Sequence, residues 1–169
     1  MRILTNSLAS TDVAIVHAGY AKYRKELLRA GVELYEMNKK ITKEKLKEKK
    51  RPLGSSKASL HAKAFVFDRD RIFIGSLNLD PRSVDHNTEI GVVFTSPEIA
   101  GEMEDWFDQN IDKLAFRLEL HQYENGSTHI RWHGLENGGN RVFDMEPHAG
   151  FWRRFGVAFM GLLPIESQL

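Results

Sequence analysis

The spacing of apolar residues predicts that strands and helices alternate from the start of the chain. Residues 2–6 read as a strand, and residues 16–30 show the three- and four-residue apolar spacing of a helix. Gly31 follows, where a residue of left-handed conformation often ends a helix. Residues 32–37 alternate between apolar and polar, as a strand does. The expected apolar side of the helix contains Tyr20, Tyr23, Leu27 and Leu28.

Three short strands and a long helix are predicted in the middle of the chain. Residues 60–67 and 71–76 are strands separated by only three residues, which predicts a hairpin. Residues 88–94 form a third strand. The Ser-Pro pair at 96–97 predicts a helix start, with serine as N-cap and proline in the first turn. The apolar face of that helix, interpreted as core packing, contains Ile99, Met103, Trp106, Phe107, Ile111 and Leu114.

The last third of the chain predicts a hairpin and a terminal helix. Apolar and polar residues alternate in 116–123 and in 128–133, and Glu-Asn-Gly-Ser between them is a good hairpin turn. Residues 135–147 are interpreted as turn-rich, and residues 150–163 as an apolar helix. This helix could touch a bilayer surface, although packing on its own domain is the preferred interpretation. Its aromatic and basic residues are Phe151, Trp152, Arg153, Arg154 and Phe155.

The fold class expected from this order is α/β, with a mixed β-sheet flanked by helices on both faces. The 169 residues suffice for a single domain with one core, which we place at 1–169. Within it, residues 39–58 are expected to be an exposed basic loop, and residues 150–169 an apolar helix and tail. Because the strand at Arg2 begins almost at once, we expect the chain to be a fragment of a longer protein.

Charge and cysteine content narrow the classes of function only slightly. The net charge is +1, so the whole chain does not indicate a nucleic-acid binder. Residues 39–51 nevertheless hold eight basic and two acidic residues, and this run could grip a polyanion or anionic lipid. With no cysteine, disulfides and thiolate metal sites are excluded. The most apolar stretch, residues 156–165, is about half the ~20 residues that a membrane-spanning helix needs.

Polar residues near the three middle strands form the candidate site. His61 and Lys63 are two residues apart, so both project from one face of a strand. Ser76 and Asn78 have the same spacing at the end of the next strand, and Glu89 begins the third. These groups suit a phosphate ester, because imidazole is a nucleophile or proton carrier and an ammonium pairs with phosphoryl oxygens. Hydroxyl and amide donors add stabilisation, and a carboxylate can orient the imidazole.

These residues resemble the motif of a known superfamily. His61-x-Lys63-x-x-x-x-Asp68, followed by Gly75-Ser76-x-Asn78, is similar to the HKD motif of the phospholipase D superfamily. The run from Gly75 to Ser83 followed by Asn-Thr-Glu at 87–89 resembles the second motif of bacterial cardiolipin synthases, in their C-type branch. Residues near both ends of the chain extend the likeness, which implies the C-terminal half of such an enzyme.

The resemblance implies a role for each matching position. His61 would attack phosphorus to give a phosphohistidine, or act as acid and base for a partner histidine. Lys63 and Asn78 would hold the phosphoryl oxygens, Ser76 would assist them, and Glu89 would orient His61. Asp68 and Gly75 would be structural. The family's chemistry needs neither a metal nor another cofactor.

A complete site of this kind needs two such motifs, and this chain holds one. None of the six other histidines has lysine two positions later. The expected partners are therefore an N-terminal half with the other motif or a second copy of the chain, together with a phospholipid substrate and a membrane surface. A lone monomer should be inactive. The implied location is peripheral, on the cytoplasmic side of the bacterial inner membrane.

The favoured function is phosphatidyl transfer in cardiolipin synthesis, and two alternatives remain open. One is a homodimeric phospholipase D-like nuclease, for which the basic run 39–51 would bind the polyanion. The other is a catalytically silent half-domain. The flanking sequence favours the lipid enzyme, so nucleic acid is not an expected partner.

Overall fold

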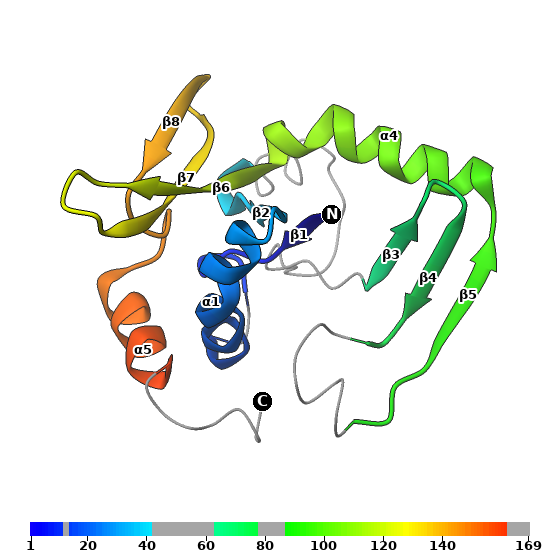
Figure 1. Cartoon of the computed structure of the whole chain (residues 1–169), viewed down its shortest axis with the longest axis horizontal. Helices are drawn as coiled ribbons and strands as arrows, with labels where there is room; N and C mark the ends of the chain where they lie inside the picture. The colour runs from blue at the N-terminus through cyan, green and yellow to red at the C-terminus, as the bar shows by residue number, and fades with distance from the viewer. Residues whose placement is uncertain (12–13, 42–62, 78–86, 162–169) are drawn as a thin grey trace, which may run out of the picture. The chain divides into compact units, whose positions relative to one another are not determined.

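The computed structural model describes residues 1–11, 14–41, 63–77 and 87–161, whose elements follow an α/β order (Figure 1). They divide into two compact units. The first contains β1 (Arg2–Thr5), α1 (Ala14–Arg29), β2 (Glu33–Met37), β6 (Ala115–Gln122), β7 (Thr128–Glu136), β8 (Gly139–Phe143) and α5 (Phe151–Gly161). The second contains β3 (Ala64–Phe67), β4 (Arg71–Gly75), β5 (Gly91–Thr95) and most of α4 (Pro97–Leu114).

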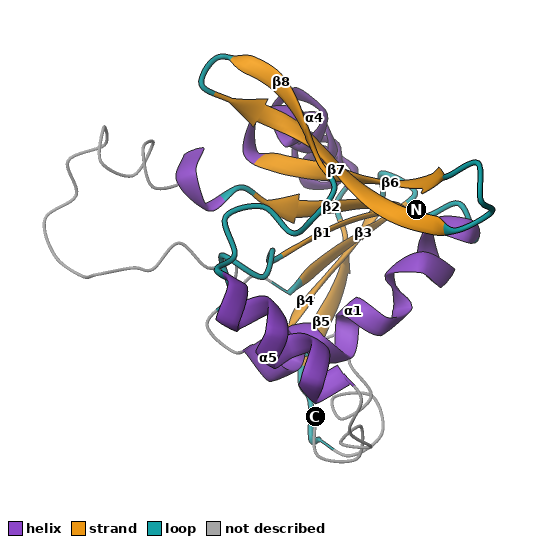
Figure 2. Cartoon of the chain, turned by 90° about the vertical axis from the view of Figure 1, so that its left-hand side faces the viewer, coloured by secondary structure: helices purple, strands orange, loops and turns teal. Residues whose placement is uncertain are grey.

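The first unit is built on a mixed five-stranded sheet in the order β1-β2-β6-β7-β8 (Figure 2). β1 and β2 run parallel, and every other neighbouring pair is antiparallel. α1 packs on β2, β6 and α5. The predicted α/β fold with a mixed sheet is therefore confirmed. Its core is formed by buried side chains, namely Leu34, Phe116, Leu118 and Trp132.

Helix α1 ends as the sequence predicts. Gly31 has a φ of 81°, its N–H donates to Leu28 O at 3.1 Å, and Val32 N–H donates to Leu27 O at 3.0 Å. These two bonds are the Schellman pair, which satisfies the last carbonyls of a helix. The predicted apolar side is wrong at Tyr23, which is exposed. The side of α1 that is buried instead includes His17, Ala18 and Arg24.

Strand β2 does not alternate as expected. Leu34, Tyr35 and Glu36 are all buried, because both faces of this interior strand are covered. β1 lies on one side of β2 and β6 on the other, so the strand has no open edge along the residues that pair. A carboxylate therefore lies in the centre of the first unit, where it needs partners.

The predicted hairpin between β6 and β7 is confirmed, with Gly126 at a φ of 79° in its turn. The turn-rich interpretation of residues 135–147 is wrong, because β7 continues to Glu136 and β8 pairs with it. Asn137 and Gly138 both have positive φ, 52° and 80°, as a tight hairpin turn requires. The terminal helix is present as α5 within the described residues.

The second unit contains its own three-stranded sheet, in the order β3-β4-β5. The hairpin of β3 and β4 is confirmed, but the single sheet expected from the sequence is replaced by two. β5 begins at Gly91, three residues later than predicted. In the second unit, Ser96 Oγ accepts a hydrogen bond from Ile99 N–H at 3.4 Å, so the predicted start of α4 is confirmed. The predicted core packing of α4 is wrong at Ile99 and Trp106, which are exposed.

Only residues 39–41 of the expected basic loop are described, and they form a helical turn. Lys39 is half-buried, and its Nζ donates to Ala9 O at 2.6 Å. At this position the expectation of an exposed loop is wrong, because the Lys39 ammonium is hydrogen-bonded to the backbone carbonyl of Ala9. Residues 42–58 lie outside the described residues.

Candidate functional site

The candidate site lies at one end of the sheet in the second unit. The antiparallel register pairs Ala64 with Ile74 and Gly75 with Gly91. Gly75 N–H donates to Lys63 O at 3.2 Å, which continues the pairing one step beyond β3. The start of β3, the end of β4 and the start of β5 therefore meet at the same end of the sheet.

Close packing at this end explains why position 75 is glycine. A Cβ on Gly75 would lie 2.5 Å from Ile90 O and 2.7 Å from Phe73 Cζ. A Cβ on Gly91 would meet the same Phe73 ring at 2.2 Å. Because real Cβ atoms essentially never approach so closely, the aromatic ring fits only over two glycines. Position 75 therefore has no room for a side chain beside Phe73 and Ile90.

Ser76 and Glu89 are in direct contact. Ser76 Oγ donates a short hydrogen bond to Glu89 Oε2 and accepts one from Ile90 N–H at 3.0 Å. Ser76 N–H donates to Ile90 O at 2.8 Å, so both main chain and side chain of the serine are held. Asn87 Nδ2 donates to the other carboxylate oxygen, Glu89 Oε1, at 3.4 Å. The hydroxyl and the carboxylate are thereby fixed with respect to each other.

The structure brings three of the predicted site residues to the same end of the sheet: Lys63, Ser76 and Glu89. Asp68 lies at the other end, in the turn between β3 and β4, exposed and with a φ of 54°. Its carboxylate is 3.9 Å from Arg71 Nη2. His61 and Asn78 lie outside the described residues, so their approach to this group stays a prediction.

The three groups differ in chemistry in a way that suits one substrate class. An ammonium supplies positive charge for phosphoryl oxygens, and a hydroxyl supplies a hydrogen bond. A carboxylate can orient an imidazole and stabilise the charge that the ring gains. Lys63, Ser76 and Glu89 are each partly accessible, as groups that meet a substrate must be. The arrangement can therefore serve phosphodiester chemistry.

Comparison with known proteins identifies the family of the chain. A family model described as "Cardiolipin synthase, PLD-like domain" matches residues 1–111, about two thirds of the chain. The chain belongs to this family.

Curated relatives of this PLD-like domain are longer proteins. Cardiolipin synthase C of Escherichia coli (strain K12) is 42% identical over 99% of the chain and 34% of its own length. Two proteins of Helicobacter pylori, both titled "Uncharacterized protein", are 32% identical (strain 26695) and 41% identical (strain J99). The chain covers 32% of each, so it spans about a third of these relatives. No solved structure was found to match it.

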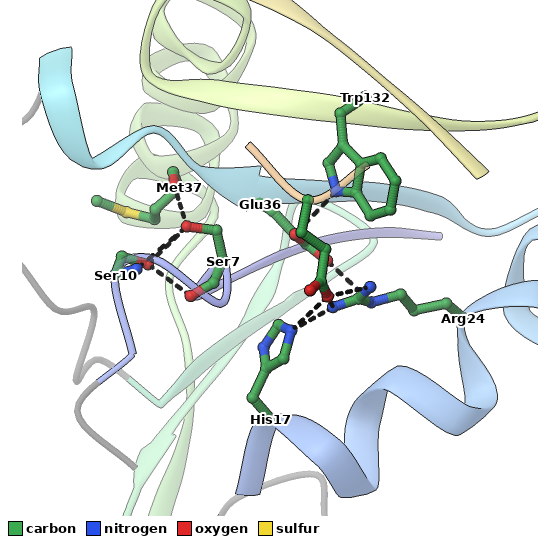
Figure 3. Close-up of polar contacts among 8 residues, drawn as sticks. Ser7, Ser10, His17, Arg24, Glu36, Met37 and Trp132 are labelled. Carbon is green, nitrogen blue, oxygen red and sulfur yellow. Dashed lines mark hydrogen bonds and ion pairs between the residues drawn. The ribbon is translucent and has the colours of Figure 1, made fainter. Parts of the chain in front are cut away.

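The first unit of this PLD-like domain contains a buried charge network that the sequence interpretation missed (Figure 3). Arg24 Nε is 3.0 Å from Glu36 Oε1, and both terminal nitrogens of the guanidinium lie 2.8 Å from Glu146 Oε1. Trp132 Nε1 donates to Glu36 Oε2 at 3.0 Å. His17 Nε2 contacts the Arg24 guanidinium and is 3.2 Å from Glu146 Oε1. The network therefore pairs the buried Arg24 guanidinium with two carboxylates, Glu36 and Glu146.

The environment of this network shifts the pKa of three groups. Burial, the largest single cause, would lower the pKa of Arg24, but the charges of Glu36, Tyr20 and Glu146 together outweigh it and the net pKa is raised. Burial raises the pKa of Tyr20, and the Glu36 carboxylate adds to the effect. Burial would also raise the pKa of Glu146, yet the hydrogen bond with His17 and the charge of Arg24 lower it overall. The network therefore favours the charged forms of Arg24 and Glu146 and the neutral form of Tyr20.

A signal for this network was present in the sequence. His17, Tyr20 and Arg24 occur at i, i+3 and i+7, so they share one face of α1. Glu36 comes two residues after Leu34 in β2, so both side chains point to the same face of the strand, and Leu34 is a core residue. Glu146 and Trp132 lie beyond residue 111, outside the family match. No local pattern indicates that they join the network.

Proposed function

We propose that this chain carries out phosphatidyl transfer in cardiolipin synthesis, with a phosphohistidine formed on His61. The observation that carries the proposal is the meeting of Lys63, Ser76 and Glu89 at one end of a sheet, in a PLD-like domain of the cardiolipin synthase family. The name of the Escherichia coli relative, cardiolipin synthase C, supports a lipid substrate.

The proposed reaction has two displacements at phosphorus. His61 attacks the phosphate of one phospholipid, the bond from phosphorus to the headgroup oxygen breaks, and a partner histidine protonates the leaving alcohol. An alcohol group of a second lipid then attacks the phosphohistidine, gives its proton to the partner histidine and releases His61. Water as the attacking group gives hydrolysis instead. No metal or cofactor takes part in either displacement.

Each remaining residue acts on the charge that develops. Lys63 and Asn78 hold the phosphoryl oxygens, and Ser76 adds a donor beside them. Glu89 stabilises the positive charge that His61 gains as it is phosphorylated. The hydrogen bond from Ser76 to Glu89 supports this role, because it fixes the carboxylate at the end of the sheet where Lys63 lies.

The proposed partners follow from the need for two motifs. A second PLD-like half, in the same polypeptide or in a second copy of this chain, supplies the other histidine. The isolated monomer is expected to be inactive. The enzyme works at the surface of a phospholipid membrane, on the cytoplasmic side of the inner membrane.

A chimera tests the function directly. The 169 residues replace the matching segment of the Escherichia coli cardiolipin synthase C, and the purified chimera is incubated with phosphatidylglycerol. We expect cardiolipin to form, and His61→Ala to abolish it. His129→Ala, which changes an exposed histidine of β7, is the matched control and keeps activity. A chimera without product, or a His61→Ala variant with full activity, rejects the proposal.

The nuclease alternative has its own test with the unmodified chain. Gel filtration and a DNA-cleavage assay are run on the same preparation. A dimer that cuts DNA through His61, with no cardiolipin from the chimera, would replace the lipid function by the nuclease. If neither assay shows His61-dependent turnover, the chain is a silent half-domain.

A further inference from the structure

Helix α5 is fixed in orientation by a narrow inner face. Val157 is buried in a small cluster with Leu8, Ala18 and Ala149. One helical turn before Val157, Arg153 Nη2 donates to Thr11 O at 2.5 Å. These two anchors hold the helix against α1 and the segment before it, so the side of α5 that faces outward is determined.

The outward side of α5 is aromatic. Phe151 is 66% exposed, Trp152 79%, Phe155 57% and Phe159 56%. Ring centroids are 5.4 Å apart for Phe151 and Trp152, and 6.4 Å for Trp152 and Phe155. A helix of a globular domain normally turns its apolar stripe toward the core. Here the stripe is exposed, and the rings of Phe151, Trp152 and Phe155 lie next to one another.

Charge distinguishes α5 from the other exposed tryptophan of the chain. α5 contains Arg153 and Arg154 and no acidic residue. Trp106 on α4 is also exposed, but Glu102, Asp105 and other acidic residues of that helix surround it in sequence. Arg153 is held by Thr11 O, but an aromatic patch next to Arg154 complements an anionic surface, whereas an acidic helix repels one.

We propose that the aromatic face of α5 (Phe151, Trp152, Phe155 and Phe159) docks on the surface of an anionic phospholipid bilayer. Eleven residues make a helix about 16 Å long, which fits in the plane of the headgroups. Among the described helices, none has the length and hydropathy needed to cross a bilayer. Trp152 and the phenylalanines enter the boundary of the acyl chains, and Arg154 remains beside the lipid phosphates.

This proposal deepens the membrane association included in the proposed function, since it names the surface that makes the contact. It depends on the substrate class proposed above, but not on the chemistry at His61. A protein partner on the same face is the competing occupant. In that case the patch would give no affinity for lipid vesicles.

The test is co-sedimentation of the full 169-residue chain with vesicles. Vesicles of phosphatidylcholine alone are compared with an equal mixture of phosphatidylcholine and phosphatidylglycerol. We expect binding to the mixture, weakened about tenfold or more in a Trp152→Ser, Phe155→Ser variant. Trp106→Ser is the matched control and leaves binding unchanged. Equal binding by the α5 variant and the parent chain overturns the proposal, as does an absence of binding by the parent.

Tryptophan fluorescence locates the contact independently. A Trp106→Phe chain retains the buried Trp132 and the exposed Trp152. We expect lipids brominated on the acyl chain to quench its emission, and the quenching to vanish when Trp152→Phe is added. Lys113→Ala, at the exposed end of α4, is the charge control and should leave vesicle binding intact. Quenching that persists without Trp152 would reject α5 as the contact, while α5-dependent vesicle binding by a chain whose chimera forms no cardiolipin would reject only the reaction.

Discussion

Two polar clusters of this protein contain similar groups in opposite surroundings. The network of the first unit joins Arg24 and Glu36, which are 4% and 0% exposed, to other buried side chains. The site of the second unit joins Ser76, Glu89 and Lys63, which are all partly accessible. In the network each charge already has its counter-charge. At the site, the side chains of Lys63, Ser76 and Glu89 are accessible to a substrate.

The difference shows why charged residues alone do not locate a function. A buried, fully paired carboxylate contributes to the fold, and removing its partner exposes the cost of an isolated charge. A carboxylate at an accessible edge changes stability little but can act on a bound ligand. Substitutions in the two clusters should therefore separate into effects on unfolding and effects on turnover.

Glu36→Ala is expected to have the largest effect. It leaves the buried Arg24 without its nearest carboxylate and removes the acceptor of Trp132. We expect a loss of about 3–5 kcal/mol in the free energy of unfolding, measured by urea denaturation. Asp144→Ala breaks the exposed pair with Arg131 and should change stability far less, since solvent screens that pair. Similar losses in the two variants would remove the contrast between the clusters.

Lys63→Ala should separate activity from stability most clearly. The loss of one preorganised positive group is expected to lower the transferase rate of the chimera about 100- to 1,000-fold. The thermal midpoint should stay close to that of the parent, since the side chain lies at the end of a sheet. Lys113→Ala, at the exposed end of α4, is the control for general charge. A Lys63→Ala enzyme with parental turnover would contradict the site.

Glu89→Gln should have a smaller effect on turnover. The amide keeps the shape of the side chain and can still accept from Ser76, but it has no negative charge to stabilise an imidazolium. A hydrogen bond to a charged group is worth about 1.5–3 kcal/mol, so we expect a decrease of roughly 10- to 100-fold. If Ser76→Ala lowers turnover more than Glu89→Gln does, the hydroxyl and not the carboxylate is the more important of the pair.

Glu146→Gln should have the smallest effect and one that depends on pH. The folded-state pKa of Glu146 is below the ordinary 4.5, so its contribution is present above pH 4.5 and is lost as pH falls through the lowered pKa. We expect the variant to be less stable than the parent at neutral pH, and the difference to shrink as pH falls below 4.5 and through the lowered pKa. A difference that grows in acid would mean that Glu146 is not ionised in the network.

Local chemistry made much of the fold predictable. The Ser96-Pro97 helix start, Gly31 and the turn at Gly126 depend on a few neighbouring residues, and each is present as expected. β8 was missed although Asn137-Gly138 is a strong hairpin signal, because its strand is short and mostly exposed. The division of the strands into two sheets depends on pairing between distant segments, which no local pattern contains.

The candidate site was predictable in part. The strand order and the two-residue spacing along the strands predict that Lys63, Ser76 and Glu89 lie at one end of a sheet, and the structure agrees. The positions of His61 and Asn78 stay predictions. The burial of Glu36 was not predicted, since a glutamate in an alternating strand is usually solvent-facing. It becomes understandable only when Arg24 and Trp132, from separate elements, are brought to it.

The long-range contacts of Glu36 and Arg24 have a consequence for how the protein is made. Trp132 reaches Glu36 across 96 residues, and Glu146 reaches Arg24 across 122. At a ribosomal rate of about 5–20 residues per second, roughly 5–25 s pass before the later partner emerges. During that interval the nascent chain holds β2 without its β6 neighbour and both charges in water. Chaperone occupancy of the nascent chain should therefore fall once Trp132 and Glu146 have both emerged.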